Sequence, residues 1–209
     1  MTGGARQPSA EGRRRLMRDH DEVVEQFAAA DAVLLALGRS SSDADTDAVL
    51  ATVAASARRL CRCQGVSIYL LHGEEFDLVA TQGLSPEIES YVVAHPFRRD
   101  RDSMIGRAAL DRRIEQVNDV LTDPSYGRRD VQEIAGYRTL IAAPLILDDE
   151  VVGALSLWRT AVEPFDERTI AVLRTFAARQ PPSYATCTWY ASWRAGSESW
   201  GARSNSWRP

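Results

Sequence analysis

Apolar residues recur at spacings of three and four along the first part of the chain. Between residues 21 and 38 they line one side of a helix that ends at Gly38. A second amphipathic segment runs from about residue 45 to 63. The pattern therefore predicts two helices before any strand. The stripe on the first helix consists of Val23, Phe27, Ala30, Leu34 and Leu37.

Runs of β-branched and aromatic residues then predict two hairpins. Residues 66–71 and 76–81 flank one polar turn, and residues 140–147 and 151–158 flank another. Pro144 lacks a backbone donor and predicts a bulge or an interrupted ladder in the second hairpin. A shorter strand is expected at 114–117. We expect an antiparallel sheet with the second hairpin at its centre.

Helical segments surround these strands. Residues 86–94 and 103–113 are expected to be helical within an irregular stretch, and a last amphipathic helix begins near Pro164. Ile170, Leu173 and Phe176 share one face of that helix. The chain order is two helices, a hairpin, an irregular stretch with short helices, a second hairpin and a last helix, and this order predicts an α+β fold.

Length and charge restrict the number of domains and the classes of partner that we expect. A chain of 209 residues suits one well-buried domain with flanking segments. The net charge of −4 gives no attraction for nucleic acid or anionic lipid, and all 25 positive side chains are arginine. No apolar run reaches the roughly 18 residues of a membrane span. We expect a cytoplasmic protein with no nucleic-acid or membrane partner.

The chain divides into three parts. Residues 1–18 have no periodicity and predict a disordered leader, and residues 19–180 form the domain. Residues 181–209 are atypical, because they hold four of the five tryptophans and no apolar period. Two explanations stay open for this tail. It is a native disordered segment, or it is translated out of frame, since compatible codons read in a neighbouring frame continue the last helix.

Several short motifs occur in an order that resembles a bacterial GAF domain. They are ATQGLS at 80–85, SMIGRA at 103–108, IEQVNDV at 114–120, DPSY at 123–126, GYRTLIAAPL at 136–145, VVGALSL at 151–157 and PFDE at 164–167. The resemblance implies a six-stranded antiparallel sheet. The N- and C-terminal helices would flank one face, and a ligand pocket roofed by residues 86–136 would lie on the other.

The resemblance also implies a sensory and regulatory role in signal transduction. The domain would bind a small molecule or a partner and signal through paired terminal helices to an output module, as a homodimer and not as an enzyme. No output module is recognisable, so the chain resembles the sensor fragment of a larger regulator such as a two-component histidine kinase. Two alternatives remain: a dimerisation scaffold without a ligand, and an enzyme resembling free methionine sulfoxide reductase.

The candidate site residues follow from this architecture. Any one of the pocket residues also has a purely structural explanation, in helix packing, turn capping or core closure. The dimer interface is expected to comprise the stripe of the first helix together with Leu173 and Phe176. The pocket is expected to include Ile105, Gly106, Asp119, Tyr126, Tyr137 and Thr139.

Cofactors of the family are disfavoured one by one. Haem needs an axial ligand, and His95 in the roof is expected to face solvent. A bilin needs a pocket cysteine, but Cys61 and Cys63 fall at the end of the second helix, two positions apart and so on different faces, and we expect both to be buried small residues. The Asn-Lys pair of cyclic-nucleotide-binding members is missing before Phe165. Three cysteines are too few for a zinc site, and no nucleophile is paired with a base. The identity of any ligand stays open.

Overall fold

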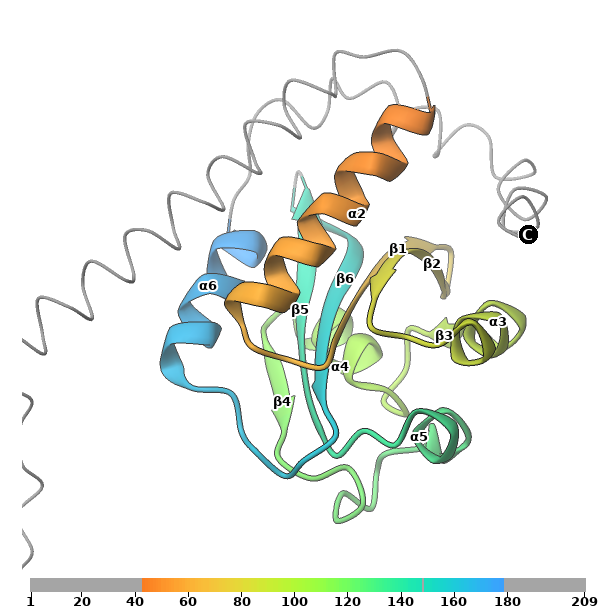
Figure 1. Cartoon of the computed structure of the whole chain (residues 1–209), viewed down its shortest axis with the longest axis vertical. Helices are drawn as coiled ribbons and strands as arrows, with labels where there is room; N and C mark the ends of the chain where they lie inside the picture. Colours follow the sequence, from red (N-terminus) through yellow and green to blue (C-terminus); the bar gives the residue numbers. More distant parts are fainter. Residues whose placement is uncertain (1–42, 148, 179–209) are drawn as a thin grey trace, which may run out of the picture.

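A computed structural model describes residues 43–147 and 149–178 (Figure 1). The predicted leader, the helix at 21–38 and the tail at 181–209 lie outside the described residues. No helix in the described ranges is long and apolar enough to cross a membrane. The elements in chain order are α2 (Asp43–Leu60), β1 (Gly65–His72), β2 (Glu75–Gln82), α3 (Pro86–Ala94), β3 (Phe97–Arg98), α4 (Met104–Asp111), β4 (Glu115–Val117), α5 (Arg129–Ala135), β5 (Thr139–Leu147), β6 (Glu150–Arg159) and α6 (Glu167–Ala178).

The six strands form one sheet in the order β3-β2-β1-β6-β5-β4. Every neighbouring pair is antiparallel. This confirms the predicted α+β fold with a six-stranded antiparallel sheet. The centre of the sheet is the β1–β6 pair, so the β5–β6 hairpin lies one strand away from the predicted position.

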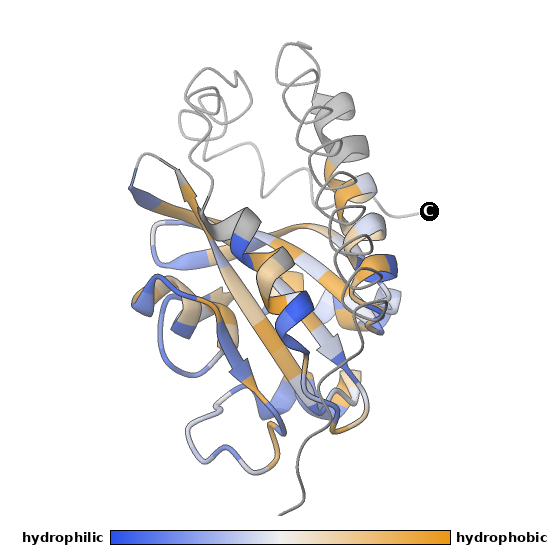
Figure 2. Ribbon diagram, turned by 90° about the vertical axis from the view of Figure 1, so that its left-hand side faces the viewer, coloured by the Kyte–Doolittle hydropathy of each residue, from blue (hydrophilic) through white to orange (hydrophobic). Residues whose placement is uncertain are grey.

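Helices cover both faces of this sheet. Figure 1 shows α2 and α6 on one face and α3 and α5 beyond the other. Two apolar clusters fill the two interfaces: one contains residues of α2 and α6, and the other contains residues of α3, α4 and α5. Figure 2 shows hydrophobic residues along the central strands between these layers. The sheet is therefore buried on both sides, and we call these clusters the helix-side core and the roof-side core.

The helix α2 ends earlier than its pattern predicts. It stops at Leu60, and Arg62 adopts a left-handed backbone conformation with φ of 46°. Cys61 and Cys63 therefore lie in a turn, where the face rule for helices does not apply. The prediction that they occupy different faces is wrong, because both are buried in the helix-side core.

The proline in β5 sits beside an irregularity, as predicted. Pro144 pairs with Ala154 of β6, and the register shifts between Leu145 and Ile146. On the other side, the pairing of β5 with β4 stops at Ala142. Pro144 therefore occupies a stretch of β5 that has a strand on one side only, where a missing N–H costs no ladder bond.

The end of β6 is tied to both flanking helices by Arg159. This side chain donates from Nη2 to the Cys61 carbonyl at 3.2 Å, and from Nη1 to the carbonyls of Glu163 at 3.1 Å and Pro164 at 3.2 Å. Its guanidinium carbon lies 4.3 Å from the centre of the Phe165 ring. Arg159 thus joins the end of β6 to the turn after α2 and the loop before α6.

Replacing this guanidinium tests its contribution to stability. We expect Arg159→Lys to lower the free energy of unfolding by about 1–3 kcal/mol, because one ammonium group cannot reach three carbonyls and stack on a ring. Urea unfolding followed by circular dichroism measures the change. Arg98→Lys is the matched control, since Arg98 is mostly exposed and makes a single 3.4 Å contact with Glu75. Equal stability of the two variants would contradict the role given to Arg159.

Candidate functional site

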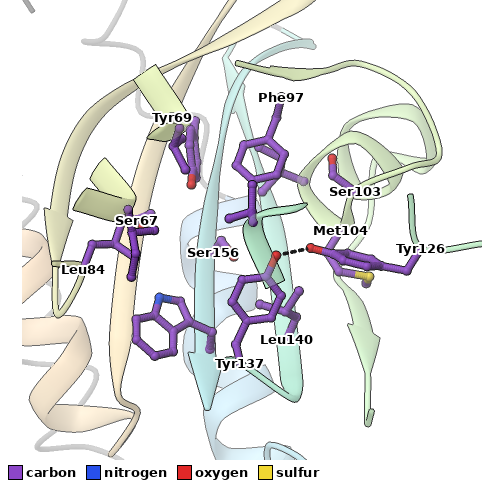
Figure 3. Close-up of a pocket in the computed structure, with 15 residues that line it drawn as sticks. Ser67, Tyr69, Leu84, Phe97, Ser103, Met104, Tyr126, Tyr137, Leu140 and Ser156 are labelled. Atoms are coloured by element: carbon purple, nitrogen blue, oxygen red, sulfur yellow. Dashed lines mark hydrogen bonds between the residues drawn. The ribbon is translucent and has the colours of Figure 1, made fainter. Parts of the chain in front are cut away.

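A small cavity lies in the roof-side core, between the sheet and the segment that covers it. Its volume is about 40 Å³, which is room for about three water molecules. Fifteen residues line it, and Figure 3 shows that side chains from the sheet and from the roof converge on it. They are Ser67, Tyr69, Leu84, Ile88, Val92, Phe97, Ser103, Met104, Ile105, Tyr126, Val131, Tyr137, Leu140, Ser156 and Trp158.

Successive side chains of the central strands alternate between the two faces of the sheet, so those that line the cavity are two positions apart. In β1, Val66 and Ile68 belong to the helix-side core, whereas Ser67 and Tyr69 line the cavity. The central strand β6 alternates in the same way and sends Ser156 and Trp158 to the cavity. The floor of the cavity is therefore fixed by the register of the two central strands.

The roof is closed by a cluster of Arg128, Asp130 and Tyr91, which we call the Arg128 cluster. Arg128 donates to the carbonyls of His95 at 2.9 Å and Pro96 at 3.3 Å, and to the Asp130 carboxylate at 3.1 Å. The Tyr91 hydroxyl donates to the same carboxylate at 3.2 Å. These contacts join the end of α3 to the start of α5.

The same guanidinium separates two compartments. Its carbon lies 4.2 Å from the centre of the Phe97 ring, and Phe97 lines the inner cavity. Arg128 itself lines a second, larger cleft of about 260 Å³, together with Asp100, Asp102 and Asp130. Ser103 lines both spaces. Charged side chains thus line the second cleft, whereas the fifteen residues of the inner cavity include none.

Two further ion pairs fasten the loop between β4 and α5. Arg107 of α4 pairs with Asp123, and both side chains are largely buried. Burial alone would raise the pKa of Asp123, but hydrogen bonds from Arg107 and Ser125 bring it below its usual value. Arg138 binds Asp119 through two nitrogens at 2.8 and 2.6 Å, and this pairing lowers the pKa of Asp119.

The polar groups of the inner cavity are neutral. The hydroxyls of Tyr126 and Tyr137 lie 2.6 Å apart and hydrogen bond to each other. Burial raises the pKa of Tyr69 to about 12 and raises the pKa values of Tyr126 and Tyr137 above their usual range. All three phenols therefore stay protonated at neutral pH, and the cavity presents only uncharged donors and acceptors.

Three of the six predicted pocket residues line the cavity. Ile105 comes from the first turn of α4, whose N-cap Ser103 accepts a hydrogen bond from the Gly106 N–H at 3.1 Å. Tyr126 lies in the loop before α5, three residues ahead of Arg129, and Tyr137 follows that helix. Figure 3 shows Tyr126 and Tyr137 meeting through their hydroxyls.

The other three predicted residues do not line the cavity. Gly106 packs against backbone, since a Cβ there would lie 2.3 Å from the Asp100 carbonyl oxygen. Asp119 is engaged by Arg138 and accepts from the Leu121 N–H at 3.1 Å. Thr139 is fully buried and donates to the Asn118 carbonyl at 2.6 Å. Each has a structural partner that accounts for its position.

Four polar or aromatic residues on the cavity floor were not predicted from the sequence: Ser67, Tyr69, Ser156 and Trp158. Ser67 and Tyr69 are two apart in β1, and Ser156 and Trp158 are two apart in β6. The period-two pattern of these strands contained this signal. It was obscured because the neighbours on the opposite face, such as Leu155 and Leu157, are apolar as well.

Candidate ligands for a cofactor lie elsewhere in the described structure. His95 is exposed, as predicted, and stacks on Tyr91 with ring centres 4.3 Å apart. Cys61 and Cys63 lie in the helix-side core, across the sheet from the cavity. Within residues 43–147 and 149–178, no group of three or more His, Cys, Asp or Glu side chains is placed to hold a metal ion.

The predicted dimer residues fall mostly outside the described residues. Leu173 of α6 is only 1% exposed and packs in the helix-side core of its own chain. This contact explains its apolar character without a partner chain. The side chain of Phe176 and the stripe of Val23, Phe27, Ala30, Leu34 and Leu37 lie outside the described part.

The comparison with protein families identifies this architecture. The model of the GAF domain matches residues 45–179. The chain belongs to the GAF domain family. No curated protein matches it.

Solved structures share the GAF fold at low sequence identity. The GAF domain of a phosphoenolpyruvate-protein phosphotransferase from Coxiella burnetii is 18% identical, with a TM-score of 0.58, over 86% of this chain and 94% of the other. A putative GAF sensor protein from Burkholderia vietnamiensis is 19% identical, with a TM-score of 0.57, over 79% and 98%. Free methionine-R-sulfoxide reductase from Neisseria meningitidis, in complex with its substrate, is 21% identical, with a TM-score of 0.61, over 89% and 98%. Such identities establish the fold alone, since this fold is common to regulators and enzymes.

The buried cysteines of this GAF domain give a direct chemical prediction. Burial raises the pKa of Cys61 to about 12 and that of Cys63 to about 11. At pH 8 roughly one thiol in a thousand or fewer is therefore ionised, and only the thiolate reacts readily. We expect a Cys187→Ser variant to react very slowly with iodoacetamide when folded, and both thiols to react in urea. Mass spectrometry counts the modified thiols, and rapid native labelling would show that the cysteines are accessible nucleophiles.

Proposed function

We propose that this GAF domain is a sensor that binds a small, neutral ligand in the cavity beneath its roof. The observation that carries the proposal is the lining of the cavity, which combines aromatic rings, aliphatic side chains and hydroxyls without a single charged group. Ligand sites of this kind are mostly apolar, with a few polar groups that orient the ligand. The Arg128 cluster would regulate entry, because it closes the roof through side-chain contacts that can separate without unfolding the sheet.

The energetic argument favours a ligand without net or separated charge. A buried ion needs an opposite charge or several hydrogen bonds to offset its lost hydration. The three tyrosines of the cavity are neutral, and the nearby carboxylates and guanidiniums lie in the second cleft or in the ion pairs of the loop. A cyclic nucleotide or an amino-acid zwitterion would therefore be poorly matched.

The same reasoning supports a role other than catalysis. Reduction of methionine sulfoxide requires thiols beside the substrate, but Cys61 and Cys63 lie across the sheet and carry raised pKa values. Among the described residues that line the cavity there are hydroxyls, but no carboxylate or imidazole that could activate them as a base. These features favour ligand recognition over turnover.

We further propose that the ligand signal leaves the domain through its terminal helices, in a cytoplasmic homodimer. Ligand binding would shift the equilibrium between two roof arrangements, and this change would alter the spacing of paired helices. Support comes from the position of α2 and α6, which lie together on one face of the sheet (Figure 1) and pack in the helix-side core, across the sheet from the residues that line the cavity. An output module such as a histidine kinase would read that spacing.

Filling the cavity tests the ligand site. We expect neutral aromatic compounds to raise the melting temperature of the wild-type domain, since a ligand at 100 times its Kd adds about 2.7 kcal/mol. We expect Ser156→Val to abolish this shift, because two methyl groups would occupy the space beside the Ser156 hydroxyl. Thermal shift against a panel of neutral, anionic and zwitterionic compounds provides the measurement.

The control for this experiment is Ser90→Val on the exposed side of α3. It should respond to ligands as the wild type does. Stabilisation of the wild type by anionic or zwitterionic compounds alone would contradict the neutral-ligand proposal. A shift that survives in Ser156→Val would place the binding site elsewhere.

The signalling step has its own test. Arg174 on α6 is exposed, so a spin label attached to Arg174→Cys in the Cys187→Ser background reports the distance between two copies of α6. We expect pulsed electron paramagnetic resonance to show a distance distribution that shifts when a stabilising ligand is added. A distribution that is present but unchanged by the ligand would exclude transmission through α6, and no intermolecular distance would exclude the homodimer.

A dimerisation scaffold is the second candidate, and one observation favours it. The cavity volume of about 40 Å³ is far below the roughly 300–1,000 Å³ of drug-sized ligand pockets. A scaffold would need no larger space. A native dimer that no compound of the panel stabilises would support this candidate over the sensor.

A further inference from the structure

The indole of Trp158 occupies a constrained position at one end of the cavity. Trp158 pairs with Gly65 across the β1–β6 ladder. A Cβ on Gly65 would lie 2.2 to 2.5 Å from three atoms of the indole, including 2.5 Å from Nε1. The indole therefore lies against the backbone of β1 and requires a glycine there. Gly65 is two residues from Ser67, so this is the Ser67 end of the cavity.

The indole N–H is buried without a partner. Trp158 is 7% exposed, and its Nε1 is shielded from solvent with no hydrogen-bonding partner among the described protein atoms. An indole nitrogen only donates, and a buried donor left unpaired is costly. Several other polar groups of the lining have partners: Ser67 contacts Thr81 at 3.2 Å, and Tyr126 contacts Tyr137. Among the fully buried polar atoms of the described residues that line the cavity, Trp158 Nε1 is therefore the donor without a protein partner.

The two ends of the cavity differ in whether their polar groups have hydrogen-bond partners. Figure 3 shows Ser67 and Leu84 on one side and Met104 and Tyr126 on the other. At the Tyr126 end, two hydroxyls already share a hydrogen bond. Near the Ser67 end, the buried Trp158 Nε1 has no acceptor among the described protein atoms. The surroundings between them are aromatic and aliphatic, which suits a planar apolar body once the Arg128 cluster separates and the roof makes room for it, since the closed cavity of about 40 Å³ is smaller than such a ligand.

We propose that the ligand of this domain is a neutral carbonyl compound with a planar apolar body, whose carbonyl oxygen accepts a hydrogen bond from Trp158 Nε1. The inference rests on the neutral-ligand function proposed above and specifies which functional group the ligand carries. A water molecule can also satisfy an indole N–H in a polar cavity. The two occupants are separated by how the N–H responds to a carbonyl probe.

The test uses two probes of nearly the same shape. Acetophenone carries a carbonyl, and α-methylstyrene carries a methylene group in place of that oxygen. The full chain is labelled with ¹⁵N, and the Trp158 indole signal is assigned with Trp158→Phe. If that variant does not fold, replacement of the four tryptophans after residue 180 in turn assigns the signal by elimination.

The proposal expects both probes to bind and only acetophenone to move the Trp158 N–H signal downfield. Trp158→Phe should weaken acetophenone binding about ten-fold and leave α-methylstyrene binding unchanged, since one neutral hydrogen bond is lost. Trp207→Phe is the matched control and should bind both probes as the wild type does.

Other outcomes overturn one proposal or both. If both probes bind equally and the Trp158 signal keeps an exchange peak with water, the donor is satisfied by water and the carbonyl inference fails, while neutral-ligand binding stands. The inference fails in the same way if acetophenone binds without moving the signal. If neither probe binds at millimolar concentration, the cavity does not admit neutral aromatic compounds and the proposed function fails as well.

Discussion

The antiparallel pairing of β1 with β6 decides which side chains reach each face of the sheet. Both strands are central, and helices cover both faces, so neither face can tolerate a slip of register. A shift by one residue would move Ser67 and Tyr69 into the helix-side core and Val66 and Ile68 into the cavity. The fold and the candidate site therefore depend on the same set of backbone hydrogen bonds.

Arginine is used in this domain to fasten loops, and charge is kept out of the inner cavity. Arg107, Arg128 and Arg138 each bind a carboxylate in the roof, and Arg128 also binds two carbonyls. A guanidinium offers five donors in a plane, which suits contacts with several loop carbonyls at once. The roof is thus attached by polar contacts at its edges and by apolar packing beneath, so its edges can open at lower cost than its base.

Much of the fold was predictable because its long elements have clear periods. The four long strands and α3 were located to within about two residues, because hairpin turns and the Ser85 cap mark their ends. The strand β3 and the helix α5 were not located. β3 has two residues, and α5 has seven, with an N-cap, Arg128, that makes no side-chain capping bond. β3 is too short to show a period and α5 has no capping signal, whereas β4, with three residues, was located from the β-branched residues at 114–117.

The site was less predictable than the fold. Ile105, Tyr126 and Tyr137 were identified from motifs of the family, but the same motifs also contain Gly106, Asp119 and Thr139, which serve the backbone and the loops. A motif does not separate these roles, because both require particular residues at particular positions. Trp158 was read as the end of a strand, since nothing in the sequence tells which atoms of a buried ring lack a partner.

Trp158 and Arg159 are consecutive residues of β6 with side chains on opposite faces of the sheet. The indole lines the cavity, whereas the guanidinium contacts the turn after α2 and the loop before α6. One peptide unit therefore separates the wall of the cavity from the junction of both flanking helices. Because the two side chains extend from opposite sides of the strand axis, any rotation of β6 about that axis displaces them in opposite directions, so a twist of this one strand would carry a rearrangement of the cavity and its roof to the helices on the other face.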